Sequence, residues 1–123
     1  ATKKPLLIGV TLLTSFDDEG AKRVGIDNIK KHVNSLAKLA KESGLDGVVC
    51  SPKEVKSLKD SLGKDFIAVT PGIRSSDSKE DQKRTMSPNE ALENGSDYLV
   101  IGRPIIESDN PVESIKSLLK EIH

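Results

Sequence analysis

The chain has 123 residues, a length that suits one domain, and its 19 basic and 19 acidic side chains give a net charge of zero. A neutral chain has no overall attraction to nucleic acid or to an anionic membrane, and one tyrosine with two phenylalanines offers no stacking platform for single strands. The single cysteine excludes an internal disulfide, and no apolar run reaches the ~20 residues that span a bilayer. We therefore expect one cytoplasmic domain over residues 1–123.

The first part of the chain predicts a strand, a loop, a helix and a second strand. Residues 5–13 form a near-continuous apolar run, too short for a typical helix, which predicts a fully buried strand. Residues 16–25 are polar and hold two glycines, so we expect a loop there. Asp27 is placed to cap a helix that runs to about Ser43, because apolar residues recur through it at helical spacing. Residues 47–50 then predict a short buried strand.

Three capping motifs mark the later helices. Ser51, Ser87 and Asn110 are each followed by proline, and a glutamate stands three residues after each cap. The first two helices are expected to end at Gly63 and Gly95, which supply stop signals. The third helix is expected to bury its apolar residues, namely Val112, Ile115, Leu118, Leu119 and Ile122.

Strand and helix alternate four times, because two more strands are expected at residues 66–70 and 98–101. This alternation predicts an α/β fold of four consecutive βα units around a parallel sheet. Residues 44–50 and 95–101 echo one another, since each has a helix-stopping glycine, then an aspartate and a buried strand. The echo favours repeated βα units, as in a (β/α)8 barrel.

Four units are half of such a barrel, which typically takes ~250 residues. Half a barrel leaves two open strand edges and an exposed apolar inner face, and open edges pair with other chains. We therefore expect the chain to form a homodimer, to need a complementary half-barrel, or to close into a small open α/β sheet.

Two of the predicted strands end in glycine followed by arginine. Pro71, Gly72 and Arg74 come after the third strand, and Gly102 and Arg103 after the fourth. Ligands of parallel α/β proteins bind at the carboxyl ends of strands, where glycine lets backbone N–H groups approach an anion and arginine supplies a fork of donors. The pattern predicts a site for a phosphorylated small molecule. The alternative is that these are turn glycines and surface arginines.

Other polar residues carry weaker signals. Cys50 ends a buried strand and is interpreted as a packed thiol, because no histidine lies near it in sequence. His32 and His123 have no metal-ligand pattern around them, so we expect no metal and no cofactor. Asp46 and Asp97 precede strands, at the edge of the sheet that governs stability rather than chemistry.

Five motifs together resemble orotidine 5′-phosphate decarboxylase, in that family's order and approximate spacing. They are Leu-Leu-Thr-Ser at 12–15, Gly-Leu-Asp-Gly-Val-Val-Cys-Ser at 44–51, Val-Thr-Pro-Gly-Ile-Arg at 69–74, Asp-Gln-Lys-Arg at 81–84 and Ile-Gly-Arg-Pro-Ile at 101–105. The resemblance covers nearly the whole chain and is to the C-terminal half of the family's barrel, strands five to eight. It implies a lyase of pyrimidine biosynthesis that converts orotidine 5′-phosphate to uridine 5′-phosphate (UMP) and CO2.

The resemblance also implies a role for each matching position. The backbone N–H of Gly102 and the guanidinium of Arg103 would hold the 5′-phosphate. Thr14 and Ser15 would contact the pyrimidine, and Pro71 would help to form the wall of the base pocket. The loop from Arg74 to Thr85 would close over the ligand, with Arg74 contacting the substrate and Gln82 bridging the phosphate and the pyrimidine.

The family's catalysis rests on a Lys–Asp–Lys–Asp array with an Asp-x-Lys-x-x-Asp segment, and this sequence contains no such segment. The lysine that protonates C6 is therefore absent, and we expect this chain alone to be inactive without a complementary N-terminal half. Two alternatives stand beside this interpretation. One is a stand-alone half-barrel that binds phosphate or a nucleotide monophosphate without chemistry, and the other is an engineered, self-associating folding unit.

Overall fold

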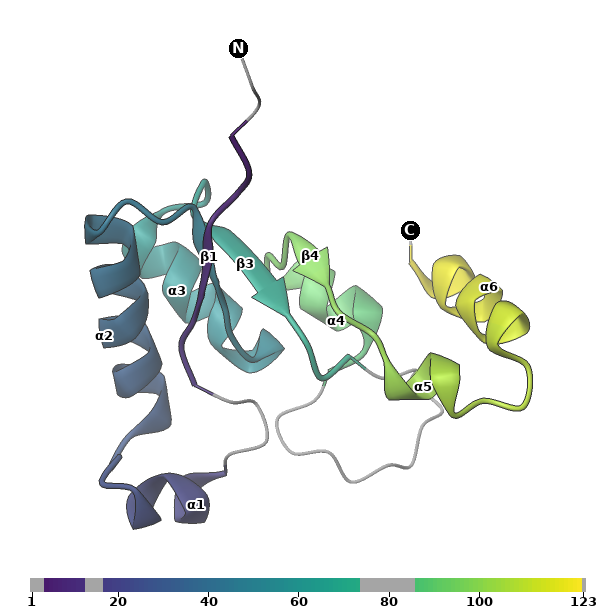
Figure 1. Ribbon diagram of the computed structural model, residues 1–123, viewed down its shortest axis with the longest axis horizontal. Coiled ribbons are helices and arrows are strands. Elements are labelled where there is room, and N and C mark those ends of the chain that lie inside the picture. The colour runs from purple at the N-terminus through teal and green to yellow at the C-terminus, as the bar shows by residue number, and fades with distance from the viewer. Residues whose placement is uncertain (1–3, 13–16, 74–85, 123) are drawn as a thin grey trace.

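The computed structural model describes residues 4–12, 17–73 and 86–122, and its described strands form one four-stranded sheet (Figure 1). The strand order is β1-β2-β3-β4, and every neighbouring pair is parallel. The strands are β1 (Ile8–Val10), β2 (Gly47–Val49), β3 (Ile67–Thr70) and β4 (Tyr98–Leu99). Because consecutive strands are neighbours, each connection carries its helices across to the next position in the sheet, as the sequence predicts.

The helices follow the strands along the chain. They are α1 (Asp18–Arg23), α2 (Ile29–Glu42), a 3-10 turn η1 (Pro52–Glu54) that runs into α3 (Val55–Leu62), α4 (Pro88–Glu93), α5 (Arg103–Ile106) and α6 (Pro111–Glu121). No helix in the described part of the chain combines the length and the apolar character needed to cross a membrane.

The predicted caps form with one shift. The Ser51–Glu54 capping box is complete, because the Ser51 N–H donates to Glu54 Oε2 at 2.9 Å and the Ser51 hydroxyl accepts in return from the N-terminal turn. Ser87 and Asn110 accept from the N–H groups of Glu90 and Glu113 at 3.3 and 3.2 Å. The expected cap of α2 was wrong by one residue, since Asn28 rather than its neighbour accepts from the Lys31 N–H.

The predicted loop over residues 16–25 was wrong where it is described, because α1 lies there. Asp17 caps it by accepting from the Gly20 N–H at 2.8 Å, and its first turn is acidic and its last turn basic, as the helix dipole favours. Only Ala21 of this helix is buried, so it shows no apolar stripe that periodicity could detect.

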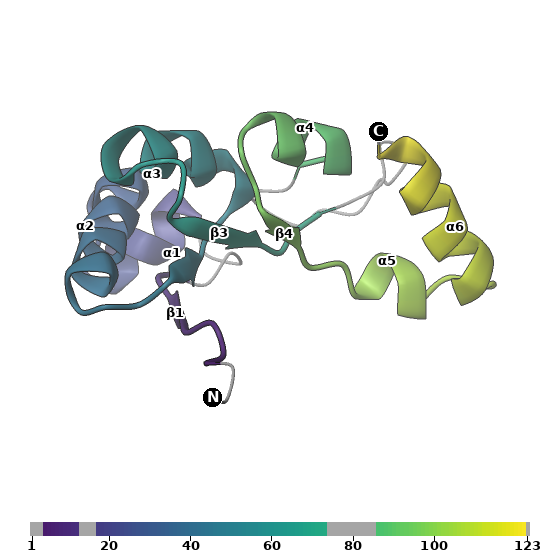
Figure 2. The same cartoon turned by 90° about the horizontal axis from the view of Figure 1, so that it is seen from above.

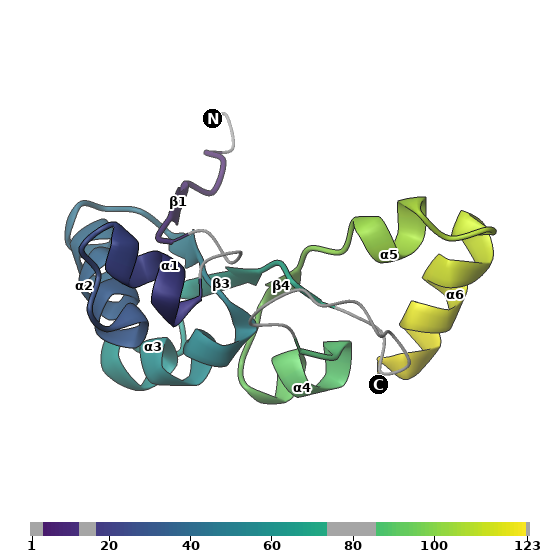
Figure 3. The ribbon, with the colours of Figure 1, turned by 90° about the horizontal axis from the view of Figure 1, so that it is seen from below.

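The apolar core fills the space between the sheet and the helices on one of its faces. Figures 2 and 3 show α2, α3 and α4 on the same side of the sheet. Val48 and Ala68 of the central strands point towards this side and are almost fully buried, as is Val33 of α2. In the described part of the chain the main core cluster comes from residues 12–68.

The opposite face of the sheet is uncovered, and we call it the open face. Register pairing aligns Val10 with Val49, Val49 with Val69 and Val69 with Tyr98, so one row of side chains crosses all four strands. Val10 is 66% exposed and Tyr98 54% exposed. The expectation of a fully buried first strand was therefore wrong: β1 is an edge strand, and no described element lies over its open face.

The C-terminal helices lie beyond β4, at the end of the molecule away from α2 (Figures 2 and 3). Helix α6 packs mainly on α5 and α4, and the Ser114 hydroxyl donates to the Pro104 carbonyl at 3.0 Å. Its expected burial was largely wrong, because only Leu118 is buried. Among the other residues named for that face, Ile122 is half-buried and three are exposed, namely Val112, Ile115 and Leu119.

Candidate functional site: a cleft between two strand ends

The carboxyl ends of β3 and β4 are held together by backbone and side-chain hydrogen bonds. The Val100 N–H donates to the Thr70 carbonyl at 2.9 Å, just where both strands end. The Thr70 hydroxyl is fully buried and donates to the Ser96 hydroxyl at 3.0 Å, which ties the end of β3 to the residues before β4. The two segments that follow the strands therefore leave the sheet side by side.

These segments line one small cleft. Its walls come from residues after β3 (Pro71, Gly72 and Ile73) and from the β4 side (Val100, Gly102, Arg103 and Pro104), and its volume is about 190 Å³. That volume equals roughly six waters at ~30 Å³ each. It is below the ~300 Å³ at which sites for whole small molecules begin, so the cleft has room for a group of phosphate size rather than for a nucleotide.

The two glycines of the cleft are there for different reasons. Gly72 has a φ of +75°, a backbone conformation that residues with a side chain adopt only with strain. Gly102 has a φ of −118°, and a Cβ built on it meets no atom within 4 Å. The backbone of Gly102 therefore does not require glycine for space within the chain, and the open volume above it is where a ligand could approach.

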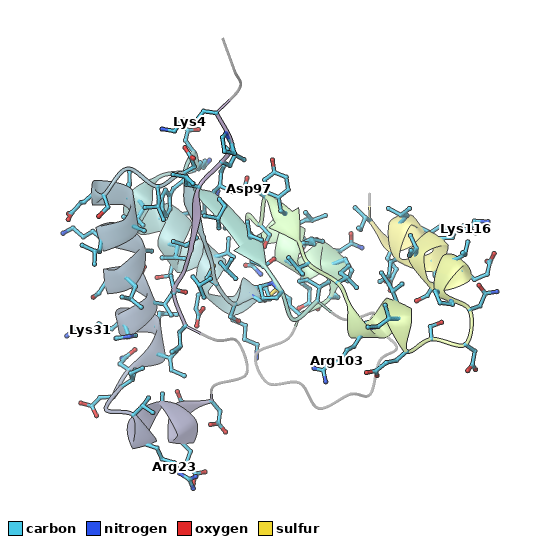
Figure 4. The ribbon with its side chains drawn as sticks, in the orientation of Figure 1. Lys4, Arg23, Lys31, Asp97, Arg103 and Lys116 are labelled. Atoms are coloured by element: carbon cyan, nitrogen blue, oxygen red, sulfur yellow. The ribbon has the colours of Figure 1, made fainter. Side chains whose placement is uncertain are left out.

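Arg103 is the first residue of α5, directly after the Gly102 cap, and its side chain is exposed. Figure 4 shows Arg103 and Asp97 at opposite ends of the sheet, so the arginine lies at the carboxyl ends of the strands. An exposed guanidinium together with the backbone N–H groups of Gly102 and Arg103 forms a set of donors that suits an oxyanion. Pro104 contributes no N–H, which limits the backbone donors at this helix start to the two residues before it.

The structure brings together the predicted site residues that it describes. Pro71, Gly102 and Arg103 line the same cleft. The remaining predicted site residues lie outside the described part of the chain: Thr14, Ser15, Arg74 and Gln82. Sequence reasoning did not name Ile73, Val100 and Pro104 as site residues, although Ile73 and Pro104 belong to the quoted motifs and Val100 directly precedes one of them.

The opposite edge of the sheet carries the two echoed aspartates. Asp46 accepts from the Leu7 N–H at 2.8 Å through Oδ2, while its own N–H donates to the Leu7 carbonyl. Asp97 makes the same pair of bonds with Ala68: its Oδ2 accepts from the Ala68 N–H at 2.9 Å, and its N–H donates to the Ala68 carbonyl at 3.0 Å. Each aspartate thus joins its strand to the preceding one at the amino-terminal edge, which accounts for the internal echo.

Asp97 has an additional partner that Asp46 lacks among the described contacts. The Lys59 ammonium lies 2.6 Å from Asp97 Oδ2, and it also donates to the carbonyls of Phe66 and Lys64. Its side chain is 10% exposed, so all three donors are directed at protein acceptors. This cluster stabilises the sheet far from the cleft.

The residues with weaker signals have ordinary environments. Cys50 is completely buried at the end of β2, as predicted for a packed thiol. His32 lies on α2 and is half-buried, while His123 lies outside the described residues. No group of three or more potential metal-ligating side chains occurs within residues 4–12, 17–73 and 86–122.

Comparison with known proteins extends over nearly the whole chain. It is 55% identical to orotidine 5′-phosphate decarboxylase of Pseudoalteromonas translucida (strain TAC 125) over 98% of this chain and 52% of the relative. It is 51% identical to the Legionella pneumophila (strain Corby) enzyme of that name, over 97% and 53%. The chain spans about half the length of the curated relatives it matches.

Solved structures are likewise matched over about half of their length. The crystal structure of orotidine 5′-phosphate decarboxylase from Lactobacillus acidophilus matches with a TM-score of 0.75 and 40% identity, over 97% of this chain and 50% of that one. An uncharacterized conserved protein from Geobacillus kaustophilus matches with a TM-score of 0.74 and 36% identity, over 98% and 50%. The four βα units are therefore half of a (β/α)8 barrel.

The family model described as orotidine 5′-phosphate decarboxylase / HUMPS matches residues 1–118. With that match over most of its length, four parallel βα units and a donor-lined cleft at the last two strand ends, the chain belongs to the orotidine 5′-phosphate decarboxylase / HUMPS family.

Proposed function

We propose that this chain is the C-terminal half of an orotidine 5′-phosphate decarboxylase and acts in pyrimidine biosynthesis once a complementary N-terminal half is present. The cleft between the ends of β3 and β4 carries the proposal, because it gathers Gly102, Arg103 and Pro71 in a space of phosphate size. The identity of 50% or more to several enzymes of that name supports it.

In this proposal the cleft holds the 5′-phosphate, far from the bond that breaks. The Gly102 N–H and the Arg103 guanidinium donate to the phosphate oxygens, and Pro71 forms part of the wall next to the base. Binding energy gained at a remote group of the substrate helps to close and order the site around the reacting group. The chain's own part in the reaction is therefore to bind and orient.

The chemical step needs residues that this half does not supply. Decarboxylation breaks the bond between C6 and its carboxylate, releases CO2 and leaves an electron pair on C6 that must take up a proton. The sequence has no Asp-x-Lys-x-x-Asp segment, which is where the family's proton-donating lysine lies. We infer that this lysine and the charges around it come from the complementary half, and that the chain works in the cytoplasm without a cofactor.

The phosphate grip, which is the proposed phosphate-binding site made by the Gly102 N–H and the Arg103 guanidinium, is tested by titrating UMP and, separately, uridine against the chain. We expect UMP to bind and uridine to bind far more weakly, because only UMP has a phosphate. Arg103→Ala should weaken UMP binding by roughly tenfold or more, as expected for loss of a charge-assisted contact of about 1.5–3 kcal/mol.

Two further variants separate the grip from general effects. Gly102→Ala adds one methyl group to the open space at the cleft and should weaken UMP binding while leaving the thermal midpoint unchanged. Arg23→Ala is the matched control, because Arg23 is a highly exposed arginine on α1, and Figure 4 shows it well apart from Arg103. Equal UMP affinities for Arg103→Ala and Arg23→Ala would exclude the proposed grip.

A second candidate function is a binding module without chemistry. The cleft favours this candidate, because Gly102 and Arg103, which we propose to hold a phosphate, both come from this chain. Most of the residues proposed to contact the base lie outside the described part of the chain. Activity after addition of an N-terminal half decides between the two functions.

A further inference from the structure

The sheet has two open edges and one uncovered apolar face. Among the described strands β1 pairs only with β2, and β4 only with β3. The row that joins Val10, Val49, Val69 and Tyr98 crosses the open face from one edge to the other, and its two end residues are more than half exposed. Backbone edges and apolar side chains in this arrangement are a template for further strands.

Helix α6 presents a second uncovered apolar face, made by Val112, Ile115 and Leu119. The helix lies beyond β4, on the side towards which an added strand would extend the sheet (Figures 2 and 3). A helix that follows a strand in a barrel packs over the junction with the next strand. The apolar face of α6 is thus placed to cover a strand next to β4, and none of the described strands occupies that position.

We propose that the 123-residue chain by itself forms a homodimer in which β4 of each copy pairs in parallel with β1 of the other, closing an eight-stranded barrel. In this dimer the two copies are related by a two-fold axis that coincides with the axis of the barrel. Such an axis keeps all eight strands parallel and leaves no open edge. Eight strands are the number at which side chains fill a barrel's interior, and two copies supply that number.

Three observations favour a second copy as the occupant. The two edges that must meet belong to the same chain and have the same polarity, so one interface repeated twice satisfies both. The net charge is zero, so two copies do not repel one another overall. The related structures are twice as long as this chain, which is the size that two copies restore.

The dimer has a consequence for the cleft. Because all strands run in the same direction, the two clefts at the ends of β3 and β4 open at the same mouth of the barrel, on opposite sides of its axis. Each dimer then carries two phosphate-sized sites. The homodimer forms in the absence of a complementary half, so it is separate from the proposed decarboxylase function.

Sedimentation equilibrium of the chain tests the proposal without any ligand, so its result is independent of the UMP titration. We expect a species of about twice 13.3 kDa. Val10→Lys should give a monomer with an unchanged circular dichroism spectrum, because Val10 is largely exposed within one chain. Val24→Lys is the matched control and should remain dimeric, since Val24 is likewise exposed, at 61%, but directly follows α1 and belongs to neither edge strand.

Cross-linking tests the pairing of edges. A Val10→Cys chain mixed with a Val100→Cys chain should form a mixed dimer with a short bis-maleimide, while the buried Cys50 of the unsubstituted chain should not react. Cross-linking of Val10→Cys chains only to one another would overturn the β4–β1 arrangement. A wild-type monomer would overturn the proposal, and its conversion to a one-to-one complex on adding the N-terminal half of a relative would assign the open face to that half.

Discussion

Replacement of Asp97 by alanine should destabilise the sheet more than replacement of Asp46, its counterpart at the same amino-terminal edge. The substitution removes the acceptor of the Ala68 N–H at 2.9 Å and the carboxylate that lies 2.6 Å from the ammonium of Lys59. Lys59 is only 10% exposed, so its third donor loses an acceptor where water has little access. Bonds to charged groups contribute about 1.5–3 kcal/mol each, and partial exposure of Asp97 lowers this, so we expect a total loss of about 2 kcal/mol.

For a chain of this length about 2 kcal/mol corresponds to a fall of about 8 °C in the thermal midpoint. Thermal unfolding followed by circular dichroism measures it, with urea titration as a second readout of the free energy. Asp46→Ala is the internal control, because Asp46 makes the equivalent bond to the Leu7 N–H without a lysine, and about half the loss is expected. Equal losses of unfolding free energy for Asp97→Ala and Asp46→Ala would refute the role assigned to Lys59. The loss for Asp97→Asn should lie between the losses for those two variants.

Three more predictions concern particular contacts. Gly72→Ala should cost about 1–2 kcal/mol in unfolding free energy, because the φ of +75° is strained for alanine. An unchanged unfolding free energy would contradict the positive φ at this position. Glu54→Ala should cost about 1 kcal/mol in urea titration, since the buried carboxylate caps the start of η1. Leu118→Ala should cost about 2 kcal/mol or more by the same assay, whereas Leu119→Ala should cost almost nothing when it is made in the Val10→Lys chain, which we expect to be monomeric, because Leu119 is exposed within one chain. A loss for Leu119→Ala comparable to that for Leu118→Ala would mean that α6 is covered.

The order and type of most elements could be predicted because their signals are local. The Ser51 capping box, the proline after it and the positive-φ glycine at position 63 fix both ends of the η1–α3 unit, and the structure has them there. Helix α1 was missed because its signals are a capping aspartate and charges at its ends, and it buries one small residue. Local capping therefore specified a helix that hydrophobic periodicity did not reveal.

Burial of individual side chains was less predictable than the elements themselves, because it depends on which other elements pack against each one in the folded chain. Residues 5–13 and the apolar face of α6 have the composition of buried segments, yet Val10 and Leu119 are exposed. In a complete (β/α)8 barrel, segments of this kind are covered by the packed barrel interior and by the ring of helices. The candidate site was predictable in part for the opposite reason, since Pro71, Gly102 and Arg103 are placed by the ends of two adjacent parallel strands.

The most direct test of the proposed function is reconstitution with the N-terminal half of the Pseudoalteromonas translucida relative, which is 55% identical to this chain over the matched region. Loss of orotidine 5′-phosphate absorbance is followed for each half alone and for the mixture. We predict no decarboxylation by either half, decarboxylation by the mixture, and its loss when the chain carries Arg103→Ala. A well-folded one-to-one mixture without activity, or activity of this chain alone, would contradict the proposal.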